Sequence, residues 1–259
     1  MIPFPSEQDI LVGTLVFLRI SLLMMLLPVF GHKMVPAPIK AGLVGFLTLL
    51  LFPVVSKYVP VIEADVVHFS FLAIQEMLLA AALGLLAQLI FTAAQFAGQM
   101  MSMQMGMAMA NIFDPATSSQ SAIVAQFVGI LAILMWLASG AHHMFLQTLI
   151  ESFSILPPGS TWSFHGWEVI TNAAAAMFVL AVKLMAPVLL LLFFVYVALG
   201  LIARAVPQVQ VFFVSFPLSV GLGLFILGLS LPAFMSLMHD AFVGLGQDLP
   251  MFLKQLSGQ

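Results

Sequence analysis

Long apolar stretches alternate along the chain with short polar breaks. Six such stretches are each long enough to form a helix: residues 10–27, 39–56, 67–99, 121–150, 172–203 and 209–238. An apolar run of about 20 residues with few charges is typical of a helix that crosses a bilayer. The last four stretches are longer than a bilayer requires. The pattern predicts an all-α, polytopic membrane protein.

Prolines occur between these stretches and within them. Residues 28–40 contain three prolines and cannot form one continuous helix. Pro187 lies within the fifth stretch, and Pro217 and Pro232 lie within the sixth. In lipid, the backbone groups that a proline frees need protein or water as partners. We therefore expect proline-broken helices packed inside an assembly, and a brief amphipathic helix after His239.

Composition supports the membrane class and excludes several others. Hydrophobic residues make up 63% of the 259 residues and charged residues only 7%, against about 25% charged in soluble domains. The net charge of −3 comes without a basic patch, which excludes a nucleic-acid interface. The absence of cysteine excludes disulfides and thiolate chemistry. Glu7 and Asp9 stand where a signal peptide needs positive charge, so the first helix is expected to be retained.

Three charged residues lie well inside apolar stretches: Arg19, Glu76 and Lys183. Each costs roughly 2.5–3.5 kcal/mol at the centre of a membrane helix unless a partner offsets it. One interpretation is an ion or proton pathway. The other is assembly, with Glu76 paired to Arg19, to Lys183 or to a partner subunit. A proton relay needs several acids or histidines, and only one buried acid is visible, which favours assembly.

No catalytic or metal-binding pattern stands out. His142 and His143 are adjacent, so on a helix their side chains point about 100° apart and do not share a face. The zinc motif HExxH, the GxSxG elbow, the Walker A loop and the GxGxxG fingerprint are all missing from the sequence. The sequence therefore predicts a protein that is not an enzyme and holds neither metal nor cofactor.

A methionine-rich stretch spans residues 100–109, where six of ten residues are methionine. In a helix, Met101, Met105 and Met109 would share one face. In an extended chain, one side would carry Met101, Met103, Met105, Met107 and Met109. Gly106 weakens a helix here. Methionine is flexible enough to re-pack when a partner moves, so this stretch predicts a deformable pore seal. The alternative is that the methionines only fill contacts between helices.

A small polar loop follows the methionines and predicts a plug beside the seal. Its candidate plug residues are Asn111, Ile112, Phe113, Asp114 and Pro115. Phe113 is the bulky apolar side chain of this loop and is the candidate stopper. Asp114-Pro115 favours a turn, and Gly106 is the candidate hinge.

Several motifs carry a resemblance to a known family. They are Arg19 with the following LLPVF, the VPAPIKAGL connection, Gln75-Glu76 leading to Gly84, the methionine stretch into NIFDP, and ARAVPQVQVFFVSFPLSVGLGL. In this order, over essentially the whole length, they resemble the FliR family of flagellar export-gate membrane proteins. The resemblance implies one export-gate domain over residues 1–259. A FliP-like part would cover 1–203, with the plug loop at 106–121, and a FliQ-like hairpin would cover 204–259.

The resemblance also implies partners and a location. FliR-like proteins assemble with FliP-like and FliQ-like subunits into a pore-bearing complex of the bacterial inner membrane and flagellar basal body. Parts of the assembled chain would be held on the periplasmic side. FlhB-like and FlhA-like proteins are expected neighbours, and unfolded export substrates would pass through the pore.

The implied function is to help form and seal the pore of the flagellar type III export gate. Two alternatives stay open. One is the injectisome counterpart of this subunit. The other is a secondary transporter for a small solute, which should show inverted repeats and a polar site near the bilayer midplane; the sequence contains neither.

Overall fold

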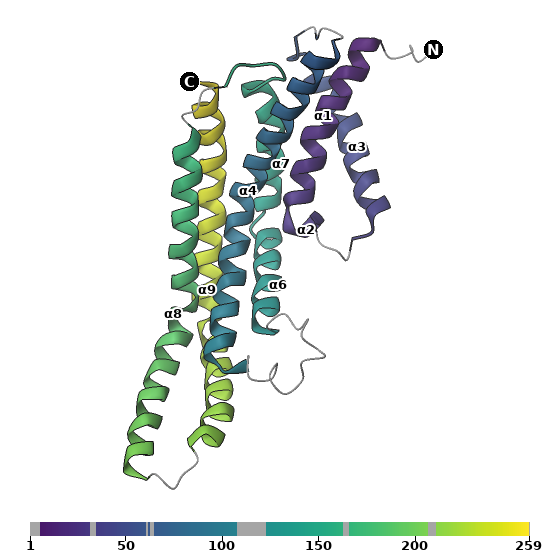
Figure 1. The fold of residues 1–259 in the computed structure, drawn as a ribbon. Helices are drawn as coiled ribbons and strands as arrows, with labels where there is room; N and C mark the ends of the chain where they lie inside the picture. The colour runs from purple at the N-terminus through teal and green to yellow at the C-terminus, as the bar shows by residue number, and fades with distance from the viewer. Residues whose placement is uncertain are drawn as a thin grey trace. The chain divides into compact units, whose positions relative to one another are not determined.

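The structure is a computed structural model that describes residues 6–31, 35–60, 62, 65–107, 123–162, 166–206 and 211–258. These residues form helices joined by turns (Figure 1). The helices are α1 (Glu7–Leu26), α2 (Pro28–Gly31), α3 (Ala37–Val55), α4 (Val66–Gln104), α6 (Ile123–Ala138), α7 (Ala141–Ile155), α8 (Trp167–Ala205) and α9 (Val211–Ser257). The prediction of an all-α protein is confirmed.

The helices have the length and apolar character that membrane crossing requires. Within the described residues, five are long and apolar enough: α1, α3, α4, α8 and the Ser215–Ser257 part of α9. The pair α6 and α7 passes the same test together, and its two helices are bent by 67°. Counting that pair as one span gives six, in agreement with the six predicted stretches.

The fourth predicted stretch, residues 121–150, is broken rather than continuous. Helix α6 ends at Ala138, and α7 begins at Ala141. Between them Gly140 has a φ of +71°, in the left-handed region that glycine enters at little cost because it has no Cβ. A glycine inside an apolar run is a weak signal in the sequence, but here it turns the chain sharply.

The sequence predicts helices that are broken at their prolines, but α8 and α9 are not interrupted there. Helix α8 continues through Pro187, and α9 continues through Pro217 and Pro232. A proline removes one donor and displaces one carbonyl, while the remaining backbone bonds still favour the helix in an apolar setting. The brief C-terminal helix expected after His239 is instead the final part of the 47-residue α9.

Contacts divide the chain into two compact units, which are described separately. The first contains Met1–Leu89, Gly140–Ala174 and Val243–Gln259. The second contains Ile90–Ser139 and Ala175–Phe242. The division at residue 203 into a FliP-like and a FliQ-like part rests on resemblance and stays a prediction.

In the first unit, α1 begins at a capping box and packs one apolar face into the core. Ser6 Oγ accepts a hydrogen bond from the Asp9 amide at 3.2 Å, and the Ser6 amide donates to the Asp9 carboxylate at 2.8 Å. These bonds satisfy amides that a helix start leaves free. Leu15, Val16 and Ile20 are fully buried on the inner face. The sequence thus fixes both where α1 starts and which face it buries.

In the second unit, aromatic packing and one close helix approach form the core. The Phe91 ring meets Trp136 edge-on at 6.0 Å and lies 5.5 Å from the Phe242 ring. Gly98 of α4 lies so close to α6 that a Cβ built on it would be 2.5 Å from Ala125 Cα. The missing side chain of Gly98 is therefore what lets the two backbones approach.

Substituting Gly98 tests this approach. We expect Gly98→Ala to lower the free energy of unfolding by about 1–3 kcal/mol, because the backbones of α4 and α6 must separate. The measurement is detergent titration of the purified protein, followed by circular dichroism. Gly221→Ala is the matched control, since a Cβ there meets nothing within 4 Å and alanine favours a helix. Equal stability of the two variants would contradict the close approach.

Candidate functional site

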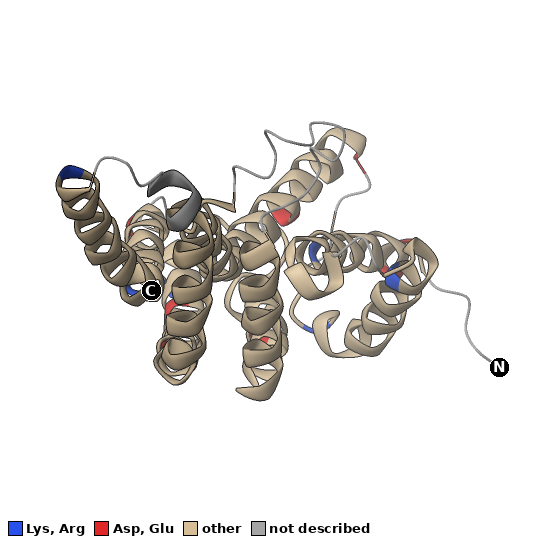
Figure 2. Ribbon diagram, turned by 90° about the horizontal axis from the view of Figure 1, so that it is seen from below, with Lys and Arg blue, Asp and Glu red and all other residues tan. Residues whose placement is uncertain are grey.

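A buried ion pair joins the first and fourth helices within the first unit. Arg19 of α1 donates from Nε to Glu76 Oε2 and from Nη2 to Glu76 Oε1 at 2.8 Å. The two residues are only 1% and 2% exposed. Two parallel hydrogen bonds make the pair bidentate, which is the strong geometry for guanidinium and carboxylate. Charged residues are sparse elsewhere on the helices (Figure 2).

Helix α7 completes the surroundings of Arg19. The guanidinium donates to Ser152 Oγ at 3.1 Å and to the Leu156 carbonyl at 2.8 Å, and its Cζ lies 4.1 Å from the centre of the Phe153 ring. Leu156 is the C-cap of α7. Carbonyls at a helix end lack partners within the helix and carry negative partial charge. Arg19 therefore neutralises Glu76 and caps α7 at the same time.

The three intramembrane charges have different surroundings. Of the three partners considered for Glu76, the structure pairs it with Arg19. Lys183 is exposed on α8, and within the described ranges it has no ion pair. A guanidinium does not release its proton in proteins. The Arg19–Glu76 pair is therefore suited to holding helices together and unsuited to relaying protons.

The described part of the methionine-rich stretch, residues 100–107, covers the end of α4 and the turn that follows it, in the second unit. Met101 and Met105 are both fully buried, and the Met105 amide donates to the Met101 carbonyl at 2.9 Å. The helical arrangement considered from the sequence is thus present for these two residues. Gly106 then takes a φ of +80°, and its amide donates to the Met103 carbonyl at 3.0 Å. Glycine thus ends α4 in the way common at helix C-termini.

Helices α8 and α9 hold this end of α4. Tyr196 of α8 donates its hydroxyl to the Gln104 carbonyl, and Ser219 of α9 donates to the Met105 carbonyl at 3.1 Å. A Cβ on Gly223 would lie 2.7 Å from Met105 Cγ, so the methionine packs directly on the α9 backbone. Two carbonyls that the helix end leaves free are therefore satisfied by neighbouring helices.

The predicted seal residues differ in accessibility. Met103 is 60% exposed. Met107 is half-buried, and its sulfur accepts from Ser102 Oγ at 3.7 Å. Outside the described residues lie Met109, Asn111, Ile112, Phe113, Asp114 and Pro115. Among the described methionines of this stretch, Met103 presents the most surface, while Met101 and Met105 fill the interior.

Sequence reasoning missed several polar partners. Ser152 and the Leu156 carbonyl beside Arg19, and Tyr196 and Ser219 beside the α4 end, were not singled out. For Tyr196 and Ser219 the only signal in the sequence is a hydroxyl within an apolar stretch, and Ser152 lies just beyond the predicted stretch 121–150. The carbonyl of Leu156 has no sequence signal, because any residue supplies one.

No metal site forms in the part of the chain that the structure describes. None of its groups of three or more His, Asp and Glu side chains is arranged to hold an ion. Contrary to the expectation that the side chains of His142 and His143 point apart, their ring centroids, in the first turn of α7, lie only 3.9 Å apart. Two histidines alone give too few ligands for a structural zinc site.

Comparison with known proteins places the chain in a family. The family described as bacterial export proteins, family 1, matches residues 10–245. The flagellar biosynthetic protein FliR of Bacillus subtilis (strain 168) is 38% identical over 217 residues, which cover 82% of this chain and 83% of that protein. The chain belongs to the FliR family of bacterial export proteins.

Other FliR proteins match over most of their length. The FliR protein of Pectobacterium carotovorum subsp. carotovorum is 33% identical over 93% of this chain and 92% of its own. The FliR protein of Escherichia coli (strain K12) is 30% identical over 90% of each chain. The resemblance of this chain to the FliR family, which the sequence motifs indicated, is thus confirmed.

A double-mutant cycle tests the role of the buried ion pair. We expect Glu76→Leu alone to lower the free energy of unfolding by about 3–5 kcal/mol, because Arg19 is left buried without a counter-charge. The double variant Arg19→Met, Glu76→Leu should regain most of that loss. The measurement is unfolding of each purified variant in a detergent titration.

The control for this cycle is Glu151→Gln. Glu151 accepts a hydrogen bond from Gln147 at 2.9 Å on the exposed side of α7, so its substitution should change stability by less than about 0.5 kcal/mol. A double variant no more stable than Glu76→Leu would show that the pair is not the main interaction at this point.

Proposed function

We propose that the chain is the FliR-type subunit of the flagellar protein export apparatus in the bacterial inner membrane. The observation that carries this proposal is the family match over residues 10–245, with relatives that are flagellar biosynthetic proteins. The five to six apolar helices of membrane-crossing length support an integral membrane subunit. The same relatives favour the flagellar apparatus over the injectisome counterpart.

The apolar surface of α8 supports assembly with other membrane subunits. This helix has 39 residues, or about 58 Å at 1.5 Å per residue, and a bilayer with its headgroups is only about 40–45 Å thick. Large apolar side chains are exposed from Trp167 to Ile202, over about 52 Å of this helix: Trp167, Phe178, Val179, Val182, Leu190, Phe193, Phe194, Val197, Leu201 and Ile202. This exposed stretch is longer than the bilayer, which supports a neighbouring protein rather than lipid over part of it.

The proposed neighbours are FliP-like and FliQ-like subunits in a hetero-oligomer, with FlhB-like and FlhA-like proteins at its opening. Part of the chain would then lie beyond the bilayer, on the periplasmic side. Within this assembly, Lys183 needs a counter-charge because it is exposed among apolar residues near the middle of α8. A carboxylate on a neighbouring subunit would supply it.

The proposed seal divides the methionines by task. Met101 and Met105 anchor the end of α4 between helices. Met103 and Met107, with the plug loop at residues 106–121 and Phe113 as its stopper, close the pore. Apolar constrictions exclude water and ions by dewetting. An unfolded export substrate would displace the loop, and the flexible methionines would re-pack around it.

The transporter alternative receives less support. A secondary transporter holds its solute at a polar site near the midplane. The buried ion pair in the described residues is Arg19–Glu76, and both charges are engaged within the chain. The carboxylate is therefore already neutralised by a side chain rather than open to a solute or a coupling ion.

Native mass spectrometry of the complex tests the assembly. The chain is expressed with the genes of its natural neighbours, extracted in mild detergent and weighed. We expect a discrete hetero-oligomer with several copies of two other small membrane proteins. A stable monomer or homodimer would contradict the proposed function.

In the same experiment, Lys183→Met should lower the yield of the complex, since a partner carboxylate would lose its counter-charge. Lys183→Arg should restore the yield.

Lys57→Met serves as the control for Lys183, because Lys57 is exposed in the turn after α3. Its complex should form with normal yield. If Lys183→Met also assembles normally, Lys183 faces solvent or lipid headgroups and not a partner carboxylate.

Ion leakage tests the seal. We expect deletion of residues 106–119 to leave the complex assembled but to make the membrane permeable to sodium ions, measured as influx into cells that express the complex. Membranes with the Met103→Ser variant should leak less than those with the deletion.

Met101→Ala should instead lower the free energy of unfolding by about 2–5 kcal/mol, because it opens a cavity between helices.

Met77→Ser is the control for Met103→Ser, because Met77 is another exposed methionine of α4, 44% accessible and far along the sequence from the stretch. It should cause no leak. Normal tightness of the membrane in the 106–119 deletion would rule out the plug.

A further inference from the structure

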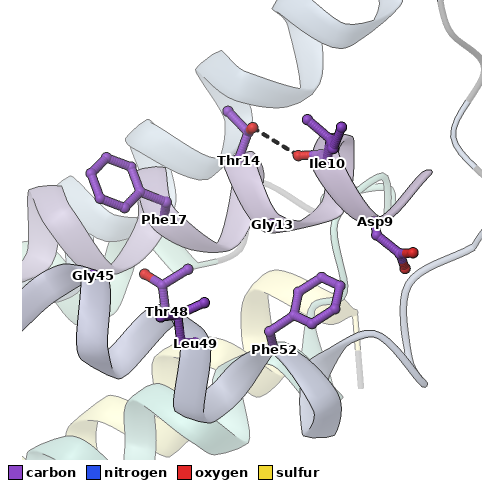
Figure 3. Close-up of a pocket in the computed structure, with 9 residues that line it drawn as sticks. All are labelled: Asp9, Ile10, Gly13, Thr14, Phe17, Gly45, Thr48, Leu49 and Phe52. Atoms are coloured by element: carbon purple, nitrogen blue, oxygen red, sulfur yellow. Dashed lines mark hydrogen bonds between the residues drawn. The ribbon is translucent and has the colours of Figure 1, made fainter. Parts of the chain in front are cut away.

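An apolar cavity of about 550 Å³ lies in the first unit between α1, α2 and α3. Met24 and Met25 of α1, Phe30 of α2, and Leu43 and Val44 of α3 form much of its wall. It shares Phe17 with a second apolar cavity of about 480 Å³ farther along α1 and α3 (Figure 3). Both volumes are within the range of ligand-binding pockets.

One charged group is present at the larger cavity. Of the described residues that line it, only Lys40 is charged. Its Nζ donates to the carbonyl of Gly31, the last residue of α2, at 3.1 Å. An ammonium carries three donors, so Lys40 can still bind an anion while this bond holds it in position. Among the described residues, the wall thus combines an apolar interior with one positive group.

The lengths of α1 and α3 indicate the depth at which Lys40 lies in a bilayer. Helix α1 has 20 residues and α3 has 19, and each is close to the 30 Å of a hydrocarbon core. Helix α1 ends at Leu26 and α3 begins at Ala37, so this end of the hairpin lies at the headgroup level. Lys40 is in the first turn of α3, while Phe17 and Val44 of the cavity wall lie deeper.

We propose that this cavity binds an acyl chain of an anionic phospholipid whose phosphate is held by Lys40. Basic groups at the ends of membrane helices bind such headgroups. A phospholipid matches this wall, because its phosphate can accept hydrogen bonds from the Lys40 ammonium while its acyl chain fills the apolar interior. The inference rests on the proposed membrane subunit and requires that its α1–α3 hairpin crosses a bilayer; a complex that forms without a lipid preference would contradict the lipid site alone.

Native mass spectrometry with defined lipids tests the site. The complex, extracted in mild detergent, is mixed with phosphatidylglycerol or with phosphatidylethanolamine, and the retained lipid is counted. We expect Lys40→Gln to reduce the preference for phosphatidylglycerol roughly five-fold, and Lys57→Gln to leave it unchanged. Ala41→Trp, which fills the cavity from its exposed side, should reduce retention of both lipids. Equal preference in Lys40→Gln and the unmodified complex would overturn the proposal.

Photo-crosslinking locates the lipid. Phosphatidylglycerol with a diazirine in its acyl chain is added to membranes that contain the complex, and the labelled peptides are identified. We expect label on residues 17–25 and 37–44 above that on the exposed face of α8, and Ala41→Trp should abolish the excess. Label spread evenly over all exposed helices would indicate surrounding lipid only. A crosslink from a photoreactive residue at position 41 to another subunit would show that protein fills the cavity. Either result would overturn the proposal.

Discussion

A buried guanidinium needs a counter-charge and partners for its remaining donors, and the first unit meets that need through three helices. Glu76 supplies the carboxylate, while Ser152 and Leu156 accept further hydrogen bonds. Removing one member leaves the others buried without partners, which is why such networks are costly to break. Helices α1, α4 and α7 are thus fixed in register by one side chain. Apolar packing alone specifies register less sharply, since methylene groups have no directional preference.

The end of α4 in the second unit depends on a related constraint. Its free carbonyls lie among apolar helices and require donors. Tyr196 and Ser219 provide them from α8 and α9, and Gly106 turns the chain away where the helix ends. The division among the methionines follows from this arrangement. Met105 packs on α9 and Met101 is buried on the same helix face, whereas Met103, on another side of the helix, stays accessible.

Sequence patterns predicted most of the helices because apolar length and polar breaks are local properties. The stretch 10–27 corresponds to α1, and 39–56 corresponds to α3, each within three residues at either end. The break at Gly140 and the continuation of α9 to Ser257 were missed. A glycine in an apolar run, or a proline in a long helix, has different effects that depend on tertiary packing. For Glu76, the sequence supplied the correct partner as one of three, but choosing among them required knowing which helices lie side by side.

The order of synthesis gives the Arg19 network a further consequence. The ribosome makes Arg19 first, Glu76 57 residues later and Leu156 137 residues later. At about 5–20 residues per second, the first helix waits roughly 3–11 s for its carboxylate and roughly 7–27 s for the end of α7. During this interval α1 carries an unpaired charge and is poorly suited to remain in lipid alone. The newly made chain therefore depends on the insertion machinery, or on a position near the headgroups, until the later helices arrive.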